Sequence, residues 1–81
     1  MSDLVVIEMP LNANILTVQA QNRKVFIWAQ VDPNEQTTKR YFEVVGTGNP
    51  IPAATRSYIG TVQLAGGSLV FHVFELLSLN K

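Results

Sequence analysis

Two runs of alternating apolar and polar residues that meet at a glycine pair are the feature that most constrains the fold. The runs span residues 63–74, with Gly66-Gly67 between them. Side chains alternate between the two faces of a β-strand, and glycine adopts the positive φ angles that a tight turn requires. The pattern therefore predicts an antiparallel β-hairpin. The predicted pairs, extended outward from the turn, are Leu64 with Leu69, Gln63 with Val70, Val62 with Phe71, Thr61 with His72, Gly60 with Val73 and Ile59 with Phe74.

A second hairpin is predicted over residues 14–31, around a turn at Asn22-Arg23. One of its faces is apolar and is expected to form core, whereas the other is mixed and carries Phe26 and Trp28. The predicted pairs are Gln21 with Lys24, Ala20 with Val25, Val18 with Ile27 and Leu16 with Ala29. The expected core face comprises Leu16, Val18, Ala20, Val25, Ile27, Ala29 and Val31, and the mixed face adds Thr17, Gln19 and Gln30 to the two aromatic residues.

The rest of the chain adds two strands and a turn. Strands are expected over 4–8 and 38–45, the second with Phe42 and Val44 on one face. Asp32-Pro33-Asn34 has the residues of a turn, and no segment shows a sustained helical period. Gly60 within a strand indicates a bend or a close approach of another element. The sequence thus predicts a single all-β domain over 1–81, with about six mostly antiparallel strands in a small sandwich or partly open barrel.

Composition narrows the classes of partner. The chain has 81 residues, of which 47% are hydrophobic and 15% charged, with no cysteine and a formal net charge of zero. A thin core and an excess of apolar residues favour a homo-oligomer. A neutral chain lacks the positive field that nucleic-acid binding uses, so nucleic acid is disfavoured. The apolar runs are too short for a membrane span and no signal-type segment stands at the start, so we expect a soluble, intracellular protein.

Candidate binding residues fall in two regions. The long irregular stretch 46–57 holds Gly46, Thr47, Gly48, Asn49 and Arg56, and loops of this length in small domains tend to be functional. No helix can start normally across Pro50 and Pro52, so a plain turn is favoured over a phosphate-binding loop, with a small-ligand contact as the alternative. Phe26 and Trp28 form either a packing layer, a protein interface or a stacking surface.

No catalytic constellation can be assembled from the sequence. His72 is the only histidine, its expected cross-strand neighbour is Thr61, and a half-buried histidine bonded to a hydroxyl or to a backbone group is the favoured interpretation. The acidic residues, Glu75 among them, are scattered along the chain, and Lys39-Arg40 is expected to be a solvated strand end. We therefore predict that the protein is not an enzyme and holds neither a cofactor nor a metal.

Six segments of the chain together resemble a known family: 15–22, 28–33, 40–42, 46–51, 58–63 and 66–75. On these segments, nearly the whole chain resembles small phage and prophage proteins of an uncharacterised domain family. Members often have histidine at the position of Asn49. The resemblance implies a soluble protein made from a phage genome in the cytoplasm of a bacterium, either an accessory factor that disables a host system or a minor part of the particle.

The function expected from these observations is that of a non-catalytic binding protein. It would cover a host protein, such as a defence component, through the 46–57 loop and the Phe26/Trp28 face. One alternative is a homo-oligomer that sequesters a small nucleotide-like ligand, with backbone donors at Gly46, Thr47 and Gly48 and the Arg56 guanidinium on phosphate. Another is a virion or assembly component whose apolar faces make lattice contacts.

Overall fold

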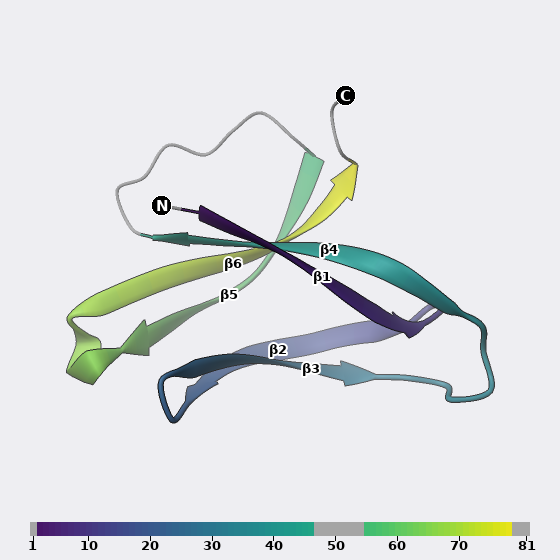
Figure 1. Cartoon of the computed structure of the whole chain (residues 1–81), viewed down its shortest axis with the longest axis horizontal. Helices are drawn as coiled ribbons and strands as arrows, with labels where there is room; N and C mark the ends of the chain where they lie inside the picture. Colours follow the sequence, from purple (N-terminus) through teal and green to yellow (C-terminus); the bar gives the residue numbers. More distant parts are fainter. Residues whose placement is uncertain (1, 47–54, 79–81) are drawn as a thin grey trace.

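Two antiparallel sheets pack face to face in the computed structural model, which describes residues 2–46 and 55–78 (Figure 1). One sheet has two strands, β2 (Asn14–Gln21) and β3 (Lys24–Gln30). The other has the spatial order β1-β4-β6-β5, and a short 3-10 turn at Ala65–Gly67 joins its last two strands. The predicted all-β architecture is confirmed, and the sheets do not close into a barrel. The strands of the larger sheet are β1 (Ser2–Pro10), β4 (Thr37–Gly46), β5 (Thr55–Leu64) and β6 (Leu69–Ser78).

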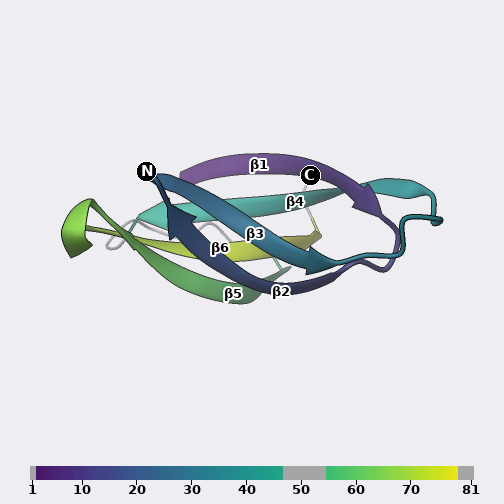
Figure 2. The ribbon, with the colours of Figure 1, turned by 90° about the horizontal axis from the view of Figure 1, so that it is seen from below.

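The β2–β3 hairpin is inserted between two neighbouring strands of the larger sheet. β1 and β4 pair with each other, and the chain leaves β1 at Leu11 and returns to β4 at Gln36. The Leu11 N–H donates to the Gln36 carbonyl at 2.7 Å, so the segment that leaves β1 and the segment that enters β4 lie side by side. The hairpin therefore folds across one face of the four-stranded sheet, as Figure 2 shows. We call this covered face the inner face and the opposite one the outer face.

The turns form where the sequence predicts them. Asn22 and Arg23 both have positive φ, at 51° and 64°, which is the geometry of a two-residue hairpin turn that follows the twist of the strands. The pairs next to this turn are confirmed. The Asn34 N–H donates to the Asp32 side chain at 3.0 Å, and the Glu35 N–H donates to the Asp32 carbonyl at 3.1 Å. An Asx turn therefore returns the chain to β4.

Two bulges correct the predicted register. Ile15, not Leu16, lies opposite Ala29, and Tyr58, not Ile59, lies opposite Phe74. A bulge adds one residue to one strand of a pair and changes which side chains face the core beyond it. Ile15 and Ile59 accordingly pack against the core, while Leu16 is 58% exposed. Val31 was expected in the core but follows the end of β3 and is also exposed.

The core lies between the inner face and the β2–β3 hairpin. One cluster of buried residues contains Phe42 and the other contains Val73, and both of these side chains are fully buried. Phe42 and Val44 both contribute to the core, as their shared strand phase predicts. The remaining buried members are Met9 and Ala13 around Phe42, and Val18 and Val62 around Val73.

Gly60 on β5 lies close to a side chain of the β2–β3 hairpin. A Cβ atom at Gly60 would lie 2.8 Å from Cγ1 of Val18, a buried and stiff β-branched side chain. Overpacking of this kind costs about 1–3 kcal/mol, which outweighs the smaller gain from restricting the unfolded chain. We expect Gly60→Ala to lower the free energy of unfolding by that amount in a urea titration.

The same contact provides the control for Gly60→Ala. Val18→Ala removes the methyl group that the new Cβ would meet, so the double variant should be more stable than the sum of the two single losses predicts. Strictly additive losses would show that the close approach to Val18 is not the reason for glycine at position 60.

Candidate functional site

Three large apolar side chains are exposed on the side of the β2–β3 hairpin that faces away from the core. Phe26 is 42% exposed, Trp28 49% and Leu16 58%. Val25 and Ile27 point inward to the core, so strand alternation turns the two aromatic rings outward. The β2 bulge leaves Leu16 unpaired beside the Thr17–Trp28 pair. We call Leu16, Phe26 and Trp28 the aromatic face.

The composition of the aromatic face suits contact with another protein. Gln19 lies opposite Phe26 and Thr17 opposite Trp28, so uncharged polar side chains accompany the rings. Single exposed apolar residues are ordinary, but neighbouring aromatic rings with polar, uncharged surroundings are typical of protein interfaces. The sequence leaves open whether these rings pack internally, and in the structure each keeps more than a third of its surface exposed.

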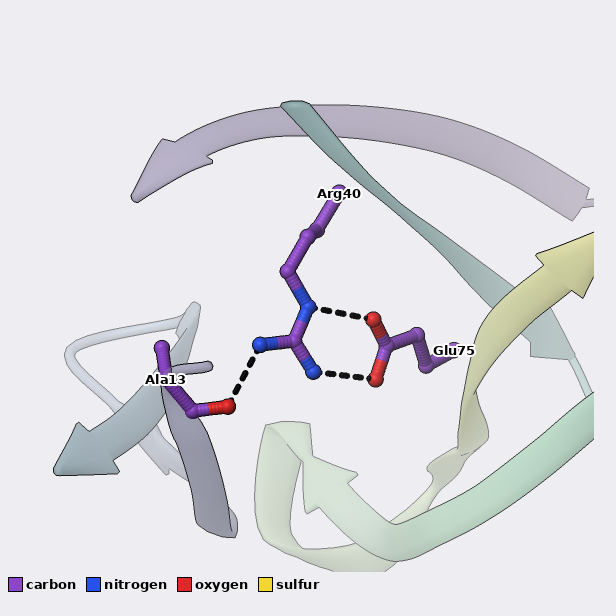
Figure 3. Close-up of polar contacts among 3 residues, drawn as sticks. All are labelled: Ala13, Arg40 and Glu75. Atoms are coloured by element: carbon purple, nitrogen blue, oxygen red, sulfur yellow. Dashed lines mark hydrogen bonds and ion pairs between the residues drawn. The ribbon is translucent and has the colours of Figure 1, made fainter. Parts of the chain in front are cut away.

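Arg40 makes a bidentate ion pair within the larger sheet and a further bond toward the open end of the β2–β3 hairpin (Figure 3). Nε and Nη2 of Arg40 on β4 donate to the two carboxylate oxygens of Glu75 on β6, at 2.6 and 2.7 Å. Nη1 of Arg40 donates to the carbonyl of Ala13 at 2.5 Å, just before β2 begins. We call these three residues the clamp. The hydrogen bonds that Arg40 donates to Glu75 raise the pKa of Arg40 above its ordinary value, although burial acts in the opposite direction.

The clamp borders a cleft of about 340 Å³ between the two sheets. Asn14, Ser57 and Tyr58 are among the other residues of its lining. Arg40 uses three nitrogens to hold the protein itself, and Glu75 neutralises its charge. Ser57 and Glu75, which both line the cleft, are cross-strand partners in the β5–β6 pair.

The expectation that Lys39-Arg40 is a solvated strand end is wrong for Arg40. Lys39 is exposed, but Arg40 lies on the inner face in phase with Phe42, and its side chain is only 20% exposed. A detectable signal was present in the sequence. Both Arg40 and Glu75 share the strand phase of predicted core residues, and two opposite charges on inward positions indicate a buried pair.

Arg56 lies on the outer face of the four-stranded sheet. Its Nη2 atom is 3.1 Å from a carboxylate oxygen of Glu43, and its guanidinium carbon lies 5.7 Å from the centre of the Phe74 ring. Glu43 is largely buried, so the charge of Arg56 is partly neutralised inside the protein. A phosphate group would therefore compete with Glu43 for this guanidinium.

His72 belongs to the same outer face. Its Nδ1 atom is 2.9 Å from the Thr61 hydroxyl, which also bonds the hydroxyl of Tyr58. The predicted pair of Thr61 with His72 is confirmed. Tyr58 also meets the Phe74 ring edge to face, at 5.6 Å between centres. These contacts fit the interpretation of His72 as a residue held by a hydroxyl.

The structure does not bring all of the predicted site residues together. Phe26 and Trp28 lie on the aromatic face, whereas Arg56 lies on the outer face of the other sheet, on the opposite side of the sandwich. Gly46 ends β4 and borders a shallow hollow near Phe71. The remaining predicted residues, Thr47, Gly48 and Asn49, lie outside the described residues.

Within 2–46 and 55–78, no group of three or more histidine, aspartate or glutamate side chains could hold a metal ion. Across those same residues, no helix has the length and apolar character needed to cross a membrane.

The fold and the aromatic face define a small two-sheet β protein with an exposed candidate interface. The chain belongs to DUF7352, a family described as a domain of unknown function, whose model matches residues 1–80. Membership of an uncharacterised family is thus confirmed. Neither a curated protein nor a solved structure matches the chain.

Proposed function

We propose that this chain is a non-catalytic binding protein that recognises another protein through the aromatic face. In the same proposal it is made by a phage, acts in the cytoplasm of the bacterial host, and covers the functional surface of a host protein such as a defence component. Inhibition of this kind needs no chemistry, because a preformed surface blocks access to its target.

The exposure of Phe26 and Trp28 is the observation that carries this proposal. Large aromatic side chains supply much of the binding energy in protein interfaces, and they do so at a small entropic cost. Here both rings project from one short strand whose other face is fixed in the core. A strand anchored in this way presents the rings without a rearrangement on binding, which lowers the cost of association.

The test compares two variants of the tagged protein recovered from the bacterial host. In one, Phe26→Ser and Trp28→Ser remove both rings; in the other, Leu69→Ser changes an apolar residue that is 50% exposed but lies at the far hairpin. Because an interface anchor contributes about 2 kcal/mol or more, loss of one ring should weaken binding about 30-fold, and the double variant should bind its partner roughly 1000-fold more weakly. Leu69→Ser should bind as the wild type does, and circular dichroism should show that both variants are folded.

The single tryptophan gives a direct readout once a partner is purified. Trp28 is 49% exposed, so covering it should shift its emission to shorter wavelength and protect it from an added quencher. A partner that binds without either change, or that is lost equally in the Leu69→Ser variant, would place the interface elsewhere and remove the proposal.

A further inference from the structure

β1 is a long and regular edge strand. It pairs with β4 over nine residues without a register shift, and its other edge has no partner among the described strands. Proteins usually protect such an edge with a bulge, a lysine or a covering element, because its free backbone groups can pair with another strand. β1 contains no bulge and no lysine.

The free backbone groups of β1 can be assigned from the ladder. The bond from Leu11 N–H to the Gln36 carbonyl continues the same β1–β4 register. Hydrogen-bonded and non-hydrogen-bonded pairs alternate along an antiparallel ladder, so odd-numbered residues of β1 bond β4. Leu4, Val6 and Glu8 therefore point their N–H and C=O groups to the free edge. Pro10 also occupies an outward position, where its missing N–H removes no bond to β4.

The side chains along this edge are apolar on both faces of the sheet. Leu4 is 56% exposed and Val6 49% on the outer face, and Val5 is 39% exposed on the inner face. The charged residues, Asp3 and Glu8, lie near the two ends of the strand. The middle of β1 thus combines unpaired backbone groups with uncovered apolar side chains, which is the chemistry that another apolar strand would match.

We propose that the partner at this edge is β1 of a second copy of the chain, joined antiparallel about a two-fold axis at Val6. Val6 then lies opposite Val6 of the second copy, Leu4 opposite Glu8, and Val5 opposite Ile7. This register uses the free N–H and C=O groups of Leu4, Val6 and Glu8 in both copies. Asp3 lies opposite Met9, so no two acidic side chains face each other.

Two-fold symmetry is the reason to favour a second copy over an unrelated strand. A single two-fold interface pairs the free β1 edge of each copy with that of the other, which leaves no β1 edge for a third copy. The assembly therefore stops at a dimer with a continuous eight-stranded sheet. The formal net charge of zero adds no long-range repulsion between copies. The two-fold axis between antiparallel edge strands is perpendicular to the sheet, so it keeps each face of the sheet on the same side. Both β2–β3 hairpins therefore lie on the same face of the eight-stranded sheet. The dimer therefore presents two copies of the aromatic face in the same general direction, which allows bivalent binding.

Native mass spectrometry and sedimentation of the full chain test the dimer. The wild type should appear at twice the chain mass of 9.0 kDa. Val6→Lys places two ammonium groups opposite each other at the axis and should shift the mass to that of the monomer, with an unchanged circular dichroism spectrum. Val31→Lys, at an exposed valine after β3, should remain dimeric.

A cysteine scan tests the register, because the natural chain has no cysteine. Opposite residues of a hydrogen-bonded antiparallel pair have Cα atoms about 5.5 Å apart, which a disulfide can span. Val6→Cys should therefore give a covalent dimer on mild oxidation, while Val5→Cys, opposite Ile7, should not. A wild type that is monomeric at every concentration, a dimer that persists in Val6→Lys, cross-linking at 5 but not 6, or growth into larger assemblies would each overturn the proposal.

Discussion

Replacing Glu75 with glutamine should lower the free energy of unfolding by about 2–3 kcal/mol. The substitution keeps the size of the side chain but removes the charge that balances Arg40, and it turns an amide donor toward guanidinium donors. Both side chains of the pair are mostly buried, at 20% and 12% exposure, so water replaces little of the lost interaction. Hydrogen bonds to charged groups contribute about 1.5–3 kcal/mol, and leaving a buried charge without its partner costs more still. Urea denaturation followed by circular dichroism measures the loss.

The matched control is Glu35→Gln, in the exposed turn before β4, which should change stability by less than about 0.5 kcal/mol. The double variant Arg40→Met with Glu75→Leu separates charge balance from packing, because an apolar pair of similar size often restores the stability that one missing partner removes. The double variant should therefore be more stable than Glu75→Gln, although Ala13 loses its donor. Equal losses for Glu75→Gln and Glu35→Gln would mean that the Arg40–Glu75 pair does not stabilise the fold.

The effect of pH on the clamp follows from the direction in which the pKa of Arg40 is shifted. The Arg40 pKa is raised in the folded protein, with the hydrogen bond to Glu75 as the largest cause. A raised pKa stabilises the folded state at every pH below the ordinary value of the group, and this contribution is lost only as pH rises through the raised value. Arginine titrates far above neutral pH, so alkaline conditions within the usual working range should not release the clamp through Arg40.

The parts of the fold that the sequence predicts are those set by local geometry. Near each turn, two-residue alternation and turn chemistry determine which residues pair, and these pairs are confirmed on both sides of Asn22-Arg23 and Gly66-Gly67. The register fails farther out, at Leu16 and Ile59, because each of them lies at a bulge, and strict two-residue alternation does not predict an inserted residue. Strict alternation places Ile15 and Ile59 on the faces away from the core. In the structure, both of them pack against the core.

The candidate site, too, was predictable only in part. The phase of Phe26 and Trp28 places them on the side away from Val25 and Ile27, but their exposure depends on whether another element covers them, which strand alternation cannot report. The clamp was missed for a different reason. Arg40 and Glu75 are 35 residues apart, and only the pairing of β4 with β6 brings them together.

Phe42→Ala should lower the free energy of unfolding by about 3–5 kcal/mol, whereas Phe26→Ala should lower it by less than about 1 kcal/mol. Both residues are phenylalanines in β-strands, but Phe42 is fully buried and Phe26 is 42% exposed. Truncating a buried ring removes its transfer free energy and leaves a cavity, and an exposed ring loses little of either. Chains of 81 residues typically have total stabilities of about 4–12 kcal/mol. Phe42→Ala therefore threatens folding itself, and Phe42→Leu, with a smaller loss expected, keeps the comparison measurable.

Circular dichroism should follow this comparison, because the exposed Trp28 ring is a weak reporter of unfolding. The stability of the Phe26→Ala variant also tests the proposed binding function. If Phe26 contributes little to stability, its ring is available to a partner, and loss of binding in Phe26 variants reports the interface. If Phe26→Ala instead costs as much as Phe42→Leu, the ring packs within the protein, and the aromatic face would no longer support a binding function. Stability and binding measured on the same Phe26 variant therefore separate a structural aromatic residue from one exposed for recognition.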